Sequence, residues 1–136
     1  MTALPPVPAP FLFNGQVLDI HDGDSLRVYV DRGMRDYSVW AIRLLGCNAR
    51  ELSMPGGPEA RDEVMRRLPP GSAVVLATVK PDKYGERKDA AVFYSTPDGV
   101  VHDLVAELIA DDWAAAWDGA GIQPVPPWPR PTGVQS

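Results

Sequence analysis

Residues 15–31 read GQVLDIHDGDSLRVYVD and residues 37–45 read YSVWAIRLL, and these two stretches decide the fold. Within the first stretch, residues 26–30 alternate apolar and polar side chains, which is the pattern of a half-buried strand. The turn signal Asp22-Gly23 separates this run from an earlier apolar run, and Asp31-Arg32-Gly33 separates it from the second stretch. The sequence therefore predicts three consecutive strands in an antiparallel meander.

The rest of the chain adds two strand patterns and two helix patterns. Residues 73–79 and 90–94 are typical of strands. Pro58 suits the first turn of a helix that Pro69-Pro70-Gly71 ends, and the apolar spacing of residues 101–113 predicts a second helix. The expected fold is mainly β (α+β): a five-stranded antiparallel OB-fold barrel with two or three helices and Pro-rich terminal arms.

Prolines are concentrated at the two ends of the chain. Of the fifteen prolines, four lie within residues 1–10 and five lie within the last thirteen residues. Regular helices and central strands do not accept proline at this density. We therefore expect a Pro-rich N-terminal arm over residues 1–14, a folded domain over residues 15–118 and a Pro-rich tail over residues 119–136.

Composition limits the functional classes. The net charge of -5 argues against binding to nucleic acid by bulk charge, so any such contact requires a local basic patch. No apolar run approaches the roughly 18 residues of a membrane span, so no membrane partner is expected. The single cysteine, Cys47, excludes an internal disulfide. The N-terminus lacks the features of a signal peptide, which favours a cytoplasmic or virion-associated protein.

Two motifs carry candidate chemistry. Asp22 and Asp24 flank a glycine and can face one hard cation, although a plain Asp-Gly hairpin explains the same residues. Arg43 lies in an otherwise apolar strand and needs an anionic partner, either a phosphate or a structural carboxylate. Asn48 can offer a carbonyl oxygen to a cation, and Glu51 is either a general base or a solvated loop acid.

The polar loop at residues 82–88 reads DKYGERK. Its three cations and its tyrosine are able to grip phosphates and stack a base. An ordinary exposed hairpin loop is the other interpretation, because neighbouring acids nearly balance the cations.

The order and spacing of these groups resemble the staphylococcal nuclease (thermonuclease) family, whose fold is a five-stranded OB barrel with helices. The resemblance extends from about Gly15 to Trp113, which is most of the chain outside the Pro-rich ends. It is carried by Glu51 and by five short motifs: Asp22-Gly23-Asp24-Ser25, Ile42-Arg43-Leu44-Leu45-Gly46, Gly57-Pro58-Glu59-Ala60, Asp82-Lys83-Tyr84-Gly85 and Val101-His102-Asp103-Leu104-Val105.

The resemblance implies a Ca²⁺-dependent phosphodiesterase that cleaves DNA or RNA by attack of water. Glu51 matches the residue proposed as general base, while Arg43 and Arg87 match the two arginines that grip the phosphate. The implied metal-site residues are Asp24, Asp22, Asn48 and the Ala49 carbonyl, and the implied substrate-binding residues are Lys83 and Tyr84.

Three departures from the family pattern leave a second function open. Asn48 replaces a carboxylate, Arg50 replaces a proline, and Glu86 takes the place of an arginine. Losing one charge about 4 Å from a cation costs roughly 4 kcal/mol at an effective dielectric of about 20. The alternative is a catalytically weak or inactive nuclease-like OB-fold module. Such a module would serve as a structural or binding component of a larger assembly, for example a phage particle, or as a homo-oligomer docked through its Pro-rich arms.

Overall fold

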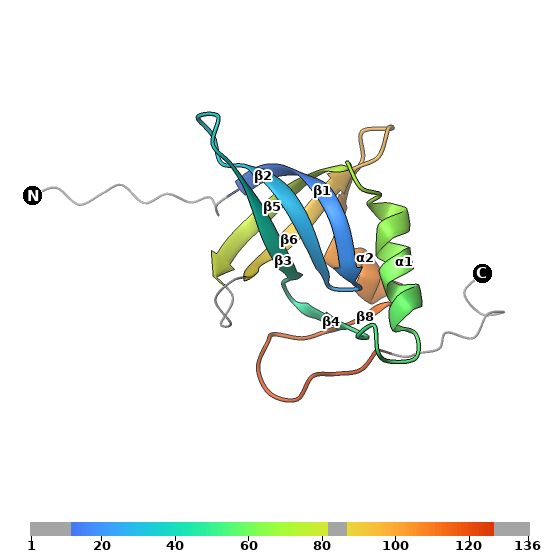
Figure 1. Ribbon diagram of the computed structural model, residues 1–136. Helices are drawn as coiled ribbons and strands as arrows, with labels where there is room; N and C mark the ends of the chain where they lie inside the picture. Colours follow the sequence, from blue (N-terminus) through green and yellow to red (C-terminus); the bar gives the residue numbers. More distant parts are fainter. Residues whose placement is uncertain (1–11, 82–86, 127–136) are drawn as a thin grey trace, which may run out of the picture.

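Five strands of the computed structural model close into an OB-type barrel, as the sequence predicts (Figure 1). The structure describes residues 12–81 and 87–126. The barrel strands are β1 (Leu12–Asp22), β2 (Ser25–Asp31), β3 (Tyr37–Leu44), β5 (Ala73–Pro81) and β6 (Arg87–Ser95). Neighbours pair antiparallel in the order β3-β2-β1-β5-β6.

The pairing that closes the barrel differs from the antiparallel expectation. Strands β3 and β6 run parallel, from Ala41 opposite Arg87 to Leu44 opposite Ala90. A parallel pair requires a long crossover connection, and α1 (Gly57–Arg67) together with β5 supplies it here. One consequence is that Arg87 lies opposite Ala41 of β3.

Alternating side chains of β2 build the core as the sequence predicts. Leu26, Val28 and Val30 are at most 2% exposed, whereas Arg27 and Tyr29 face outward. Burial of each such aliphatic side chain contributes about 1.5–3 kcal/mol. The other large, fully buried side chains come from every remaining barrel strand and from both helices. The barrel interior is therefore packed with side chains, and a ligand must bind on its outside.

The second predicted helix begins later and ends earlier than expected. Residues 101–103 form a short strand, β7 (Val101–Asp103), that pairs with β6. The Asp103 side chain accepts a hydrogen bond from the Ala106 N–H and so caps α2 (Leu104–Ala110) at its N-terminus. After α2 the backbone of Asp112 takes the left-handed conformation, with φ of 64°, so the helix does not reach Trp113.

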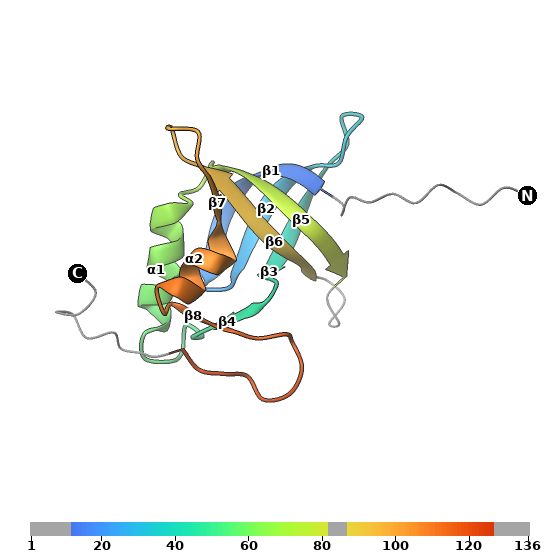
Figure 2. The same ribbon diagram turned by 180° about the vertical axis from the view of Figure 1, so that it is seen from behind.

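A second, two-stranded sheet lies where the sequence indicates only loops. Strand β4 (Cys47–Ala49) pairs antiparallel with β8 (Ala114–Ala116). Both views show this sheet next to the end of β3, with the chain after β8 passing beneath it (Figures 1 and 2). This sheet brings the C-terminal part of the chain to the predicted site.

The boundaries of the two Pro-rich arms also need correction. Residues 12–14 belong to β1, where Leu12 pairs with Ala77 and Asn14 pairs with Asp31, so the N-terminal arm does not extend to residue 14. At the other end, residues 117–126 contact the folded domain. We call residues 117–126 the C-terminal strap. Residues 1–11 and 127–136 lie outside the described part.

Candidate functional site

The register of β2 and β3 brings the two candidate motifs together. The turn between β1 and β2 carries Asp24, and Ser25 pairs directly with Arg43 near the end of β3. The Leu44 N–H donates to the Asp24 carbonyl at 2.9 Å, which fixes the turn against β3. Strand β4 follows after a short turn and places Asn48 next to Arg43. Residues far apart in the sequence thus share one end of the barrel.

Asp24 and Arg43 form a buried ion pair at the centre of the site. Arg43 Nη1 lies 3.0 Å from Asp24 Oδ2, and the two side chains are 13% and 9% exposed. Asp24 Oδ2 also accepts the Ala49 N–H at 2.8 Å, and Oδ1 accepts the Ser25 hydroxyl at 3.2 Å. Arg43 Nη2 donates to Asn48 Oδ1 at 3.3 Å. The oxygens of Asp24 and Asn48 therefore converge on one positive group, which is the guanidinium of Arg43.

Burial raises the pKa of Asp24 to about 7. The neighbouring Asp22 contributes to the same rise, both through a hydrogen bond and through its charge. The Arg43 charge and the Ala49 N–H act in the opposite direction. Ionising Asp24 therefore costs more free energy in the folded protein than in the unfolded chain. Carboxylates with raised pKa values of this kind are concentrated at functional sites.

This pKa predicts a loss of stability as the pH rises. Folded Asp24 holds its proton up to about pH 7, whereas the unfolded chain releases it near pH 4, so stability is greatest below the unfolded value. Between pH 5 and pH 8 we expect the free energy of unfolding to fall by roughly 2–3 kcal/mol. Urea titrations across this range test the expectation. Asp24→Asn has no titrating group and should flatten the profile, and an equally steep profile in this variant would contradict the assignment.

The oxygen donors of the site suit a hard divalent cation. Ca²⁺ takes carboxylate and amide oxygens as ligands, and the site offers these from Asp22, Asp24 and Asn48. In the present structure the positive charge beside Asp24 and Asn48 is the Arg43 guanidinium. The oxygens from Asp22, Asp24 and Asn48 number fewer than the roughly six to eight oxygens of a Ca²⁺ shell, so a bound Ca²⁺ would need further oxygens from water. Within the described residues, no three or more His, Cys, Asp or Glu side chains converge on one point. Ala49 turns its N–H toward Asp24, where the resemblance implies a contribution from its carbonyl.

Glu51 lies on the loop that follows β4. Its side chain is exposed, and among the described residues its carboxylate makes no hydrogen bond or ion pair. Its backbone is held firmly, because the Glu51 carbonyl accepts the Met54 N–H at 2.9 Å and packs against Gly57. Arg50 does not neutralise Glu51, since its guanidinium donates to the carbonyls of Pro55 and Pro126. The loop after β4 therefore carries an exposed carboxylate on a backbone that is fixed by hydrogen bonding.

Arg87 lies at the start of β6 and lines a cavity of about 620 Å³ on the outer face of β2 and β3. Arg27 and Arg61 line the same cavity, as does Leu52, the residue after Glu51. Arg27 is paired with Asp19, and Arg61 with Asp62. Sequence reasoning missed Arg27 and Arg61, because an exposed arginine on a strand or helix carries no signal of what faces it. Lys83 and Tyr84 lie outside the described residues.

The C-terminal strap borders the site, which no pattern in the sequence indicates. Asn48 Nδ2 donates to the Pro124 carbonyl at 2.9 Å, and Arg50 Nη2 donates to the Pro126 carbonyl at 2.9 Å. The Trp117 ring lies over Arg43, with 5.9 Å between the guanidinium carbon and the ring centroid. This geometry is a cation–π contact.

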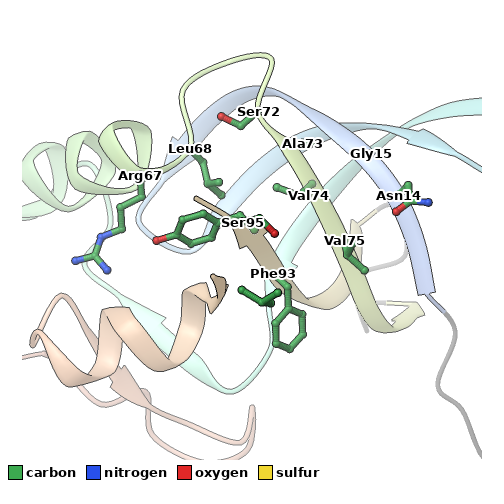
Figure 3. Close-up of a pocket in the computed structure, with 12 residues that line it drawn as sticks. Asn14, Gly15, Arg67, Leu68, Ser72, Ala73, Val74, Val75, Phe93 and Ser95 are labelled. Carbon is green, nitrogen blue, oxygen red and sulfur yellow. The ribbon is translucent and has the colours of Figure 1, made fainter. Parts of the chain in front are cut away.

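A different cavity, of about 530 Å³, contains none of the predicted site residues (Figure 3). It lies between β1, β5 and β6, where Leu68, Val74 and Phe93 contribute apolar walls, and Arg67 lies at its rim. Its lining lacks a carboxylate or a group of cations, so it does not suit a phosphodiester.

Cys47 is a buried packing residue. It is 1% exposed, and burial together with the nearby Asp24 charge raises the pKa of its thiol to about 12. A thiol with this pKa is not a nucleophile at neutral pH.

In the described part of the chain, neither helix has the length and apolar character needed to cross a membrane. A comparison with protein-family models and a search of curated proteins found no match to this chain.

Proposed function

We propose that the protein is a phosphodiesterase that cleaves DNA or RNA by attack of water, with Glu51 as the general base. The observation that carries the proposal is the exposed carboxylate of Glu51 on the loop that follows β4, the strand that holds Asn48 against the Asp24–Arg43 ion pair. A cavity that shares Ser25 with this end of the barrel is lined by Arg27, Arg61 and Arg87, of which Arg27 pairs with Asp19 and Arg61 with Asp62. Arginines together with an exposed carboxylate suit an anionic substrate that reacts with water.

Each group has a distinct task in this proposal. Arg43 and Arg87 bind the non-bridging oxygens of the phosphodiester, because the guanidinium fork matches two phosphate oxygens. The charge on these oxygens grows in the transition state, so the arginines stabilise it more than the ground state. Glu51 accepts a hydrogen bond from a water molecule and orients it for in-line attack.

Arg43 must exchange partners for this reaction. In the present arrangement its guanidinium is engaged with Asp24 and Asn48. An incoming phosphate competes for the guanidinium and releases these two side chains, which with Asp22 would then hold a divalent cation. Such a cation supplies positive charge to the phosphate oxygens. We therefore expect phosphate groups and Ca²⁺ to bind with positive coupling, as measured by calorimetric titration of each in the presence of the other.

The direct test is cleavage of single-stranded DNA and RNA by the full chain with millimolar Ca²⁺ and with EDTA. Glu51→Gln keeps the shape of the side chain but removes the base, so we expect the cleavage rate to fall about a hundredfold. Glu59→Gln is the matched control, since Glu59 is an exposed acid on α1 outside the site, and its rate should equal that of the wild type. Equal rates for Glu51→Gln and the wild type would refute the proposal.

A second candidate is a binding module without catalysis. It is favoured by the internal ion pair of Arg43 with Asp24, which engages the guanidinium without a ligand, and by the net charge of -5. Under this function the protein docks through its Pro-rich ends in a larger assembly or a homo-oligomer. Sedimentation of the full chain and of a variant lacking residues 1–10 distinguishes the binding module from the phosphodiesterase. Only the binding module predicts that the deletion changes the assembly state while the full chain cleaves no nucleic acid.

A further inference from the structure

The C-terminal strap contacts the site through side chains of two different residues. Asn48 and Arg50 donate to the carbonyls of Pro124 and Pro126, both at 2.9 Å. Pro126 is buried and Pro124 is half-buried. A proline carbonyl accepts hydrogen bonds as any other does, but the residue has no N–H to donate. The strap therefore presents acceptors to the site.

The Pro124 carbonyl determines which way the Asn48 amide faces. An amide has a donor end and an acceptor end, and a carbonyl partner accepts only from the donor end. With Nδ2 fixed on Pro124, Oδ1 is directed at the Arg43 guanidinium, which is itself only a donor. Both partners thus select the same orientation. A flipped amide would place oxygen against the Pro124 carbonyl and nitrogen against Arg43, and both contacts would be repulsive.

Arg50 ties the same strap to the loop that carries Glu51. Its Nη1 donates to the Pro55 carbonyl at 3.3 Å while its Nη2 reaches Pro126. The Glu51 carbonyl and the Met54 carbonyl accept the N–H groups of Met54 and Gly57, which makes the loop one connected unit. The Arg50 side chain is therefore the link between the strap and the backbone next to the proposed base.

We propose that the C-terminal strap is a positioning segment of the active site: its Pro124 carbonyl orients Asn48, and its Pro126 carbonyl, through Arg50, holds the loop of Glu51. This inference rests on the proposed function for its catalytic consequence. The contact with the Pro124 carbonyl requires a hydrogen-bond donor at position 48, which an amide supplies and a carboxylate does not. An aspartate there has no hydrogen to donate, so its oxygen would repel the Pro124 carbonyl.

Two truncations of the full chain test the strap directly. Removal of residues 123–136 deletes both carbonyls, whereas removal of residues 128–136 keeps both and is the matched control. The first readout is the Asn48 side-chain amide signal in ¹⁵N–¹H NMR spectra. We expect it to shift and to exchange with solvent about tenfold faster in the shorter chain only, because one buried hydrogen bond is lost.

Asn48→Asp supplies a test that keeps the chain length. The Trp117 indole N–H donates to the Ala120 carbonyl at 2.9 Å, so its exchange rate reports on the order of the strap. We expect about tenfold faster exchange in Asn48→Asp. Asn48→Gln retains a donor, and the indole exchange rate should return toward that of the wild type.

Cleavage kinetics complete the experiment. Loss of residues 123–136 should lower kcat about tenfold with KM changed less than threefold, because the strap orients groups and does not bind substrate. An unchanged Asn48 signal in the shorter chain would overturn the proposal, and so would a shifted signal with unchanged kcat. A full-length chain without cleavage would refute the proposed function and with it the catalytic part of this inference, while the NMR signals would still decide whether the strap orients Asn48.

Discussion

Replacing Arg67 by methionine is expected to lower the free energy of unfolding by about 3–5 kcal/mol. The Arg67 side chain is 10% exposed and joins the end of α1 to α2. It pairs with Glu63 at 2.7 Å, Glu107 at 3.2 Å and Asp111 at 2.8 Å. Methionine fills similar space but removes the cation that joins Glu63, Glu107 and Asp111, and leaves Glu63 with Arg66 and Glu107 with His102 as partners. Urea denaturation at neutral pH measures the loss.

Arg66→Met is the matched control for Arg67→Met. Arg66 is the preceding residue and also pairs with Glu63, but its side chain is 69% exposed. Exposed pairs contribute roughly 0–1 kcal/mol, so this variant should be nearly as stable as the wild type. A similar loss in both variants would show that the cluster is held by surface charge and not by the buried guanidinium.

Gly57→Ala is expected to cost about 3 kcal/mol or more of stability and to lower the proposed cleavage rate about a hundredfold. A Cβ at position 57 would lie 1.8 Å from the Glu51 carbonyl oxygen and 2.9 Å from the Leu52 Cα. The obstacle is backbone, which cannot rotate away as a side chain can. The loop must move, and with it the backbone that holds the Glu51 carboxylate.

Pro58→Ala is the control for Gly57→Ala, because Pro58 is exposed in the first turn of the same helix. Alanine is accepted at this position, and the change in unfolding free energy should stay below about 1 kcal/mol. Denaturant titration and cleavage rates of the two variants are measured together. Wild-type cleavage by Gly57→Ala would show that the position of this loop does not matter for the reaction.

The barrel could be predicted because its information is local. Leu26, Val28 and Val30 alternate with exposed residues, and the turn at Asp22-Gly23 fixes where the chain reverses. The three-residue strands β4 and β8 could not be predicted, since so few residues show no periodicity. Their pairing depends on two segments of the chain that meet only in the folded state.

The candidate site, too, has a part that the sequence determined and a part that only the folded structure decided. By itself, the sequence determined which residue types are present: an acidic turn, an arginine in an apolar strand and a glutamate on a loop. The chemistry of these residues is a property of their side chains alone. Only the tertiary structure decided that Arg43 bridges Asp24 and Asn48, that Arg27 and Arg61 share a cavity with Arg87, and that Pro124 reaches Asn48. A carbonyl is present in every residue, so no sequence pattern distinguishes the one that accepts a given hydrogen bond until the chain has folded.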